Sequence, residues 1–265
     1  GKVIALEGIV IDISEQKKYE NLLVYKSEHD RRTGLLNLYY LENLLTDASQ
    51  KGNVNKSALV DINMAATQLL TKAYGFNYTQ CLLKKIADAL SVCCTSRHLL
   101  FNIFIDRFVF YLQDYEDKNE LYEFCQIIER TLEPLLRTER VTAAIGVIEI
   151  EQGNKLDADS LLKKLLIASE RALDMSDKNF DICFYDSAME MQVIREEKIK
   201  RELAKIAEDE TNKGMFLLYQ PIFDLKSNKI SAFEALARLK SEELGLVSPF
   251  EFIPIAEKTK LIIPL

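Results

Sequence analysis

The side chains best suited to chemistry in this sequence are a few separate carboxylates. Glu234 stands near the end of a stretch that predicts a strand, and a carboxylate in such a place is a typical ligand of a hard metal ion. One carboxylate is not enough, because a two-metal site needs several ligands and a positioned water. Histidine does not supply them: the chain has only His29 and His98, which excludes a histidine-rich metal site.

The cysteines do not indicate a metal site either. Only Cys93 and Cys94 are adjacent, and no Cys-x-x-Cys pair occurs among the five, which are Cys81, Cys93, Cys94, Cys125 and Cys183. Reduced and mostly buried thiols are therefore the expectation.

Composition and charge restrict the classes of protein and partner. The chain has 265 residues, which allows one large domain or two smaller ones, and 48% of them are apolar, enough for a packed core. Its net charge is −7 and no basic run occurs, so nucleic acid and anionic membranes are poor partners. No apolar run approaches the roughly 18 residues of a membrane span. No signal peptide is recognised, so we expect a cytoplasmic location.

Strand-like and helix-like stretches alternate from His29 to about Asp186. Apolar runs rich in β-branched and aromatic residues predict strands at 57–62, 100–103, 108–112, 141–150 and 182–185. Apolar residues at helical spacing predict helices around 82–90, 121–135 and 161–172. The second and third strands are close enough in sequence to form a hairpin. The pattern predicts an α/β or α+β domain in which helices cover a sheet.

A highly charged helix is expected at 188–210. Its apolar stripe consists of only Ile199, Leu203 and Ile206. Three positions are few for a coiled coil, so a solvated linker helix with one packed edge is favoured over a dimerising signalling helix.

The last part of the chain predicts a strand, a turn, a second strand and a helix. The strands are expected at 215–223 and 230–238. The helix is expected at 249–258, with Ser248 as its N-cap and Pro249 at its first position.

Five short motifs occur in order in this part of the chain. They are Tyr219-Gln220-Pro221-Ile222, Glu234-Ala235-Leu236-Ala237-Arg238, Val247-Ser248-Pro249, Phe252-Ile253-Pro254 and Ala256-Glu257. Their order and spacing resemble the start of an EAL domain, the cyclic-di-GMP phosphodiesterase family. The resemblance implies that in a complete EAL domain Glu234 binds Mg²⁺ or Mn²⁺, and Gln220 and Arg238 contact the substrate. The family's other ligands and its base lie further along, so this chain is expected to hold no metal cofactor and to hydrolyse no cyclic-di-GMP.

Four stretches of the middle part resemble a GGDEF domain, the diguanylate cyclase family. They are His29-Asp30-Arg31-Arg32-Thr33-Gly34-Leu35-Leu36-Asn37, Ala58-Leu59-Val60-Asp61-Ile62-Asn63, Val141-Thr142-Ala143-Ala144-Ile145-Gly146-Val147 and Ser169-Glu170-Arg171-Ala172-Leu173. The resemblance implies a nucleotidyl-cyclase-like mixed sheet covered by helices. It also implies a family chemistry in which two GTP molecules are condensed with the help of Mg²⁺.

The signature of that family is missing. Phe104-Ile105-Asp106-Arg107-Phe108 stands where the family has Gly-Gly-Asp/Glu-Glu-Phe. Phe104 and Ile105 should obstruct the close approach to the nucleotide that glycines allow. Arg107 replaces the second acid, which serves the metal ions, and a guanidinium repels Mg²⁺ and offers no acceptor. No catalytic residue is therefore expected at 104–108.

Asp61 is the remaining candidate metal ligand of this domain, and Asn63 is a weaker ligand than a carboxylate. A solvated acid at a strand end is the equally weighted alternative for Asp61. For Arg107, a surface or ion-paired residue on the hairpin is favoured over a phosphate-binding one. The family's nucleotide loop is replaced by a different run at 64–73. We therefore expect weak GTP binding at most.

The first residues resemble the exit of a PAS sensor domain. Residues 3–13 predict a strand, and a helix with Ser14 as N-cap follows. The expected division of the chain is a PAS exit strand and linker helix at 1–28, a degenerate GGDEF domain at 29–187, a linker helix at 188–212 and the truncated start of an EAL domain at 213–265.

Together these patterns favour a non-catalytic, GGDEF-like regulatory module of a bacterial cyclic-di-GMP signalling protein that controls an adjacent EAL phosphodiesterase. The full-length protein would bind cyclic-di-GMP, and a homodimer is compatible with this organisation. Two alternatives stay open: an active diguanylate cyclase that makes cyclic-di-GMP from two GTP, and a mere spacer in an active phosphodiesterase. Arg107 and the lost glycines argue against the first, and the sequence of the complete EAL domain would decide the second.

Overall fold

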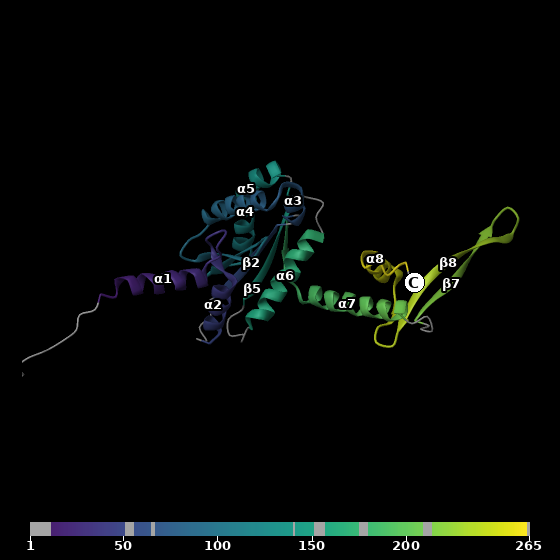
Figure 1. Cartoon of the computed structure of the whole chain (residues 1–265). Helices are drawn as coiled ribbons and strands as arrows, with labels where there is room; N and C mark the ends of the chain where they lie inside the picture. The colour runs from purple at the N-terminus through teal and green to yellow at the C-terminus, as the bar shows by residue number, and fades with distance from the viewer. Residues whose placement is uncertain are drawn as a thin grey trace, which may run out of the picture. The chain divides into compact units, whose positions relative to one another are not determined.

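The computed structural model describes residues 12–50, 56–64, 67–139, 141–150, 157–174, 180–208 and 214–263. The chain divides into two compact units, one up to Asp186 and one from Ser187 (Figure 1). The first contains a sheet of six strands in the order β1-β3-β4-β2-β5-β6, and the second a sheet in the order β7-β8-β9. The expected α/β fold class is confirmed. No helix of the described ranges is long and apolar enough to cross a membrane.

The strand β2 lies at the centre of the first sheet. It is antiparallel to both neighbours, β4 and β5, whereas β1 is parallel to β3 and β6 is parallel to β5. All eight residues of β2 are buried, and these include three polar ones, Ser57, Asp61 and Asn63. The strands are β1 (Leu36–Asn37), β2 (Ser57–Met64), β3 (His98–Phe104), β4 (Arg107–Gln113), β5 (Ala143–Ile150) and β6 (Phe180–Phe184).

Helices cover both faces of this sheet (Figure 1). Val60 and Ile62 of β2 belong to a core built with α4 and α5, whereas Leu59 belongs to a second core built with α2 and α6. Successive strand side chains point to opposite faces, so one strand serves two cores. Three of these helices match expected ones, and α2 and α3 do not. The bounds are α2 (Leu38–Gln50), α3 (Thr67–Tyr74), α4 (Phe76–Ser91), α5 (Lys118–Glu139) and α6 (Ala158–Asp174).

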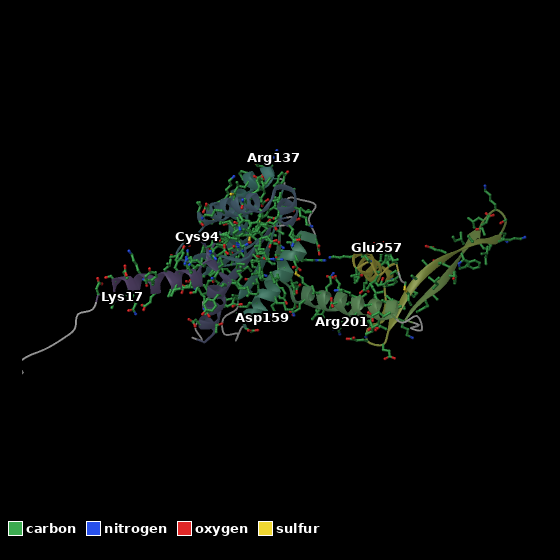
Figure 2. The ribbon with its side chains drawn as sticks, viewed as in Figure 1. Lys17, Cys94, Arg137, Asp159, Arg201 and Glu257 are labelled. Carbon is green, nitrogen blue, oxygen red and sulfur yellow. The ribbon has the colours of Figure 1, made fainter. Side chains whose placement is uncertain are left out.

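The helix α1 (Ser14–Glu28) precedes the sheet and contains no buried residue. Its side chains, such as Lys17, project from it (Figure 2). The prediction of Ser14 as N-cap is wrong: the N-cap is Ile13, and the Asp12 carboxylate accepts a hydrogen bond from the Ser14 N–H at 2.9 Å. Asp12, one residue before the N-cap Ile13, thus satisfies the backbone N–H of Ser14 in the first turn of the helix. The expected strand at 3–13 lies, except for its last two residues, outside the described residues.

None of the five cysteines forms a disulfide. Cys125 and Cys183 are buried and Cys93 is half-buried, but Cys81 and Cys94 are exposed. Figure 2 labels Cys94. The expectation of mostly buried thiols is therefore wrong, because Cys81 lies on the outer side of α4 and Cys94 follows that helix.

The second unit is a small assembly of α7 (Ser187–Glu208), a hairpin, a short strand and α8 (Pro249–Lys258). Ile199 and Leu203 of α7 are fully buried with Leu239 and Phe252 in its core, so the expected packed edge of the charged helix is confirmed. The N-cap of α8 is Ser248, whose hydroxyl accepts from the Phe250 N–H at 3.3 Å, as expected. The strands are β7 (Met215–Asp224), β8 (Lys229–Ser241) and the unexpected β9 (Gly245–Val247).

Candidate functional site

The sheet register brings Asp61 and Arg107 to the same face of two neighbouring strands. Asp61 on β2 is paired with Val109 on β4, and Asn63 with Arg107. Side chains of paired residues, and of residues two apart, share one face of a sheet. The Arg107 Nη1 donates to the Asp61 Oδ2 at 2.7 Å. Asp61 is fully buried and the Arg107 side chain is only 12% exposed.

The helix α6 supplies two more acceptors to the same guanidinium. Nη1 of Arg107 donates to the Ser169 hydroxyl at 2.7 Å, and Nη2 donates to the Glu170 carboxylate at 3.1 Å. Gly146 on β5 makes this approach possible, because a Cβ at that position would lie 2.4 Å from the Ser169 backbone nitrogen. One side chain on the hairpin therefore joins the central strand to α6.

Burial controls the electrostatics of Asp61. The pKa of its carboxyl is raised from 3.8 to about 6, mainly because burial removes water from the carboxylate, and nearby Asp106 contributes to the rise. The Arg107 charge and the Ser169 hydroxyl act in the opposite direction on this pKa. Oδ1 of Asp61 is buried without a hydrogen-bond partner. The solvated strand-end acid that was the alternative for Asp61 is therefore wrong, and Arg107 is ion-paired rather than a free surface residue.

The residues around Asp61 do not fit Mg²⁺. That ion demands oxygen ligands in near-octahedral geometry at about 2.1 Å. Here a guanidinium nitrogen, which can only donate, lies 2.7 Å from Asp61 Oδ2 and closes that side of the carboxylate. No group of three His, Cys, Asp or Glu side chains within the described part of the chain is arranged to hold a metal ion.

A cavity of about 500 Å³ lies beside the tip of the β3–β4 hairpin, next to α3 and α4. Phe104, Ile105 and Asp106 line it on the hairpin side. Phe104 and Ile105 are about half exposed, at 47% and 54%. The tip is held in place because the Thr67 hydroxyl donates to the Asp106 carboxylate and the Met64 N–H donates to the Asp106 carbonyl, both at 2.9 Å. The side chains that replace the family's glycines therefore face the cavity.

The C-terminal candidates lie on one face of the β7–β8 hairpin. Gln220 and Glu234 are directly paired across the two strands, and Arg238 is four residues further along β8. Gln220 and Glu234 are exposed, whereas Arg238 is half-buried and donates to the Ala237 carbonyl at 2.9 Å. The register thus brings these three residues to one face, but it brings no second carboxylate beside Glu234.

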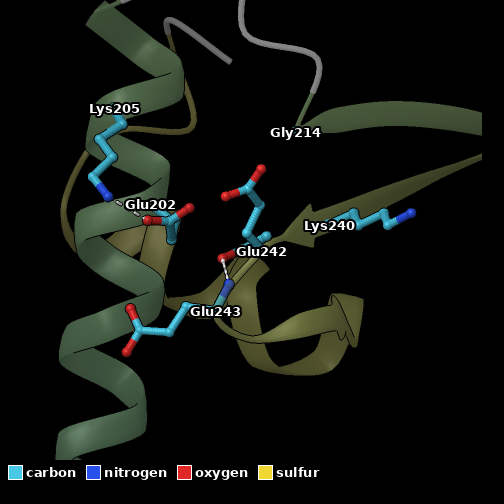
Figure 3. A pocket seen from close by; sticks show the side chains of 7 residues that line it. Glu202, Lys205, Gly214, Lys240, Glu242 and Glu243 are labelled. Atoms are coloured by element: carbon cyan, nitrogen blue, oxygen red, sulfur yellow. Dashed lines mark hydrogen bonds and ion pairs between the residues drawn. The ribbon is translucent and has the colours of Figure 1, made fainter.

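The second unit also has a hollow of about 550 Å³ between α7 and the β8–β9 turn (Figure 3). Glu202, Glu242 and Glu243 line it together with lysines. Its charges are partly paired, since the Lys205 ammonium lies 2.6 Å from the Glu202 carboxylate. None of the candidate site residues predicted from the sequence lines this hollow. The sequence shows only that the residues lining it are mostly charged.

Ser169, Glu170 and Gly146 are the site residues that sequence reasoning did not assign. All three fall within stretches that resemble the GGDEF family. Nothing in the sequence pairs them with Arg107, because that contact depends on how α6 packs on β5.

Comparison with known protein families gives two matches. Residues 27–178 match the family described as "Diguanylate cyclase, GGDEF domain", and residues 203–265 match the EAL domain. The first match covers more than half of the chain and includes every residue of the Arg107 cluster.

Three known proteins illustrate the similarity. The bifunctional diguanylate cyclase/cyclic di-GMP phosphodiesterase MucR of Pseudomonas aeruginosa is 24% identical over 92% of this chain and 35% of its own length. The cyclic di-GMP phosphodiesterase PdeR of Escherichia coli is 24% identical over 96% of this chain and 38% of its own. The S helix-GGDEF-EAL structure of Vibrio cholerae LapD, bound to c-di-GMP, shares the fold with a TM-score of 0.63 at 14% identity, over 95% of this chain and 60% of that one. The chain spans about a third of the length of these curated relatives.

Proposed function

The chain belongs to the GGDEF-domain family of diguanylate cyclases, and we propose that its GGDEF domain is a non-catalytic regulatory module of a cyclic-di-GMP signalling protein. In this proposal it controls an adjacent EAL phosphodiesterase. The domain runs over 29–187, a PAS exit and linker helix precede it at 1–28, and the linker helix at 188–212 leads to the start of the EAL domain at 213–265. The similarity to MucR and PdeR supports a place in cyclic-di-GMP signalling.

The observation that carries the proposal is the contact between Arg107 and Asp61. Phosphoryl transfer from GTP relies on metal ions that neutralise the developing charge. In this chain Arg107 stands where the family has the acid that helps to bind these metal ions. Its guanidinium forms an ion pair with the Asp61 carboxylate at 2.7 Å. A positive side chain at this position favours a folded module without turnover.

The hairpin supports the same conclusion for the nucleotide. Phe104 and Ile105 line the cavity beside the tip, where the family's glycines would leave room for a close backbone approach. We therefore propose that GTP binds weakly at most and is not converted.

The chemistry of the full-length protein is assigned to the EAL domain. In this proposal Glu234 is one ligand of Mg²⁺ or Mn²⁺ in the complete domain, and Gln220 and Arg238 contact cyclic-di-GMP. A homodimer is part of the proposal as well, because α1 exposes apolar side chains such as Tyr19 and Leu23, at 67% and 66%.

Hydrolysis by the full-length protein tests the regulatory role. Cyclic-di-GMP hydrolysis is measured with the wild type, with Arg107→Ala, and with Arg137→Ala, which removes an exposed arginine of α5. We expect Arg107→Ala to change the hydrolysis rate and Arg137→Ala to leave it unchanged. The thermal stability of Arg107→Ala is measured as well, to show that the substitution alters the GGDEF domain. If it does and the three hydrolysis rates are still equal, the result would contradict a regulatory role and favour a spacer.

A further inference from the structure

Three oxygen acceptors converge on the Arg107 guanidinium from two elements that are distant in sequence. Asp61 comes from the central strand β2, and Ser169 and Glu170 come from α6. Nη1 is shared by Asp61 and Ser169 at 2.7 Å each, and Nη2 reaches Glu170 at 3.1 Å. We propose that Asp61, Ser169 and Glu170 form a cation-binding site that the protein fills with its own Arg107 side chain.

Burial makes a cation necessary at this place. Asp61 and Ser169 are fully buried, whereas the Glu170 carboxylate is 65% exposed and forms the outer edge of the cluster. A buried carboxylate that loses its only cationic partner is strongly destabilising. Oδ1 of Asp61 has no hydrogen-bond partner, and Arg107 supplies the positive charge that acts on this carboxylate, with the Ser169 hydroxyl as a further stabilising group.

The guanidinium suits this site better than other side chains do. Its planar fork presents several N–H donors in fixed directions, so one group reaches all three acceptors. A lysine ammonium is a compact charge on a flexible stem and is expected to satisfy fewer of them. Removal of the Arg107 side chain would leave two carboxylates and a hydroxyl around an opening that borders solvent. These are ligands for a small cation, either a guanidinium compound or a divalent ion such as Mg²⁺.

The inference goes beyond the proposed regulatory function. It concerns how the hairpin is anchored to β2 and α6, and it shares the contact between Arg107 and Asp61 with the proposed function. Its readouts are thermal stability and ion response rather than hydrolysis, so a failure of this inference and a failure of the proposed function are recognised by different measurements.

Thermal unfolding tests the site at a pH well above 6, where Asp61 is ionised. Wild type, Arg107→Ala, Arg107→Lys and the exposed control Arg137→Ala are melted with MgCl₂, with methylguanidinium chloride, or with KCl at matched ionic strength. We expect the Tm of Arg107→Ala to fall by roughly 10 °C and that of Arg107→Lys to fall less. MgCl₂ or methylguanidinium, but not KCl, should restore part of the loss in Arg107→Ala. In wild type and in Arg137→Ala, the Tm should change by the same amount with each of the three salts.

A second variant covers the case in which Arg107→Ala does not fold. The neutral pair Asp61→Asn with Arg107→Met removes the buried negative charge together with its partner, so it should fold and show no specific response to Mg²⁺ or methylguanidinium. The inference is overturned if Arg107→Ala melts like the wild type, if KCl restores it as well as MgCl₂ does, or if the neutral pair is no more stable than Arg107→Ala.

Discussion

The Asp61 carboxylate and the Arg107 guanidinium, 46 residues apart in sequence, lie 2.7 Å apart because β2 and β4 are neighbouring strands. The pair occupies the face of the sheet that α6 covers, where Ser169 and Glu170 complete its hydrogen bonds. A substitution that removes a family acid has thus become a structural contact inside the domain. The predictions below follow from this contact and from the elements that hold it.

The stability of the domain should decrease as the pH rises through the pKa of Asp61. The folded carboxyl has a pKa of about 6, against 3.8 for an ordinary aspartate, and Arg107, Asp106 and Glu170 are the charged groups around it. Between these values the folded state keeps a proton that the unfolded state releases, so the stabilisation is complete below about pH 4 and is lost as the pH rises through about 6. The free energy of unfolding should fall by about 2 to 3 kcal/mol over this range. Urea unfolding at several pH values measures this free energy. An equal decrease with pH in Asp61→Asn would show that another group is responsible.

Gly146→Ala should destabilise the first unit. A Cβ at Gly146 would lie 2.4 Å from the Ser169 backbone nitrogen, so α6 must move away from β5 and carry Ser169 away from Arg107. Overpacking of this kind costs about 1 to 3 kcal/mol. Ala144→Gly on the same strand is the comparison, with an expected loss of about 1 kcal/mol. Chemical unfolding measures both, and a Gly146→Ala protein as stable as the wild type would show that the close contact is not restrictive.

GTP should not bind with micromolar affinity in the presence of Mg²⁺. Phe104 and Ile105 face the cavity, and Arg107 occupies the cation side of Asp61. Isothermal calorimetry with the purified chain measures this directly. The triple variant Phe104→Gly, Ile105→Gly, Arg107→Glu should regain little binding, because segment 64–73 keeps its own sequence. Micromolar binding by the wild type would contradict this prediction.

This chain should not bind Mn²⁺ through Glu234. The carboxylate is exposed on β8, its cross-strand neighbour is the neutral Gln220, and the described residues supply no three-acid group. Glu234→Ala should therefore leave both the thermal stability and the Mn²⁺ titration of the chain unchanged. A specific Mn²⁺ signal that disappears in Glu234→Ala would show that this face already holds a metal ion.

Much of the fold was predictable because each element carries a periodic pattern. The buried run of β2 and the helical spacing of α4, α5 and α6 were recognisable without any structure. The helix α3 was not, since its eight residues, Thr67–Tyr74, make only about two turns, too few for a helical spacing of apolar residues to stand out. β1 and β9 have only two and three residues, too few for a pattern. The Leu41 and Leu45 spacing in α2 was a usable signal that was missed.

The candidate site was predictable residue by residue but not as an arrangement. The sequence marked Asp61 and Arg107 separately, and the charge of Arg107 already argued against Mg²⁺. Their pairing follows from the β2–β4 register, in which Asn63 rather than Asp61 is the direct partner of Arg107. The convergence of Ser169 and Glu170 depends on tertiary packing through Gly146, which no local pattern encodes.

The central claim is that this GGDEF domain makes no cyclic-di-GMP, because Arg107 stands at the position of a metal-binding acid and holds Asp61. The most direct test is incubation of the purified chain with GTP and Mg²⁺ or Mn²⁺, followed by chromatography for cyclic-di-GMP, with an active diguanylate cyclase as positive control. We predict no product above the no-protein control. Product above that control, abolished by Asp61→Asn, would contradict the account.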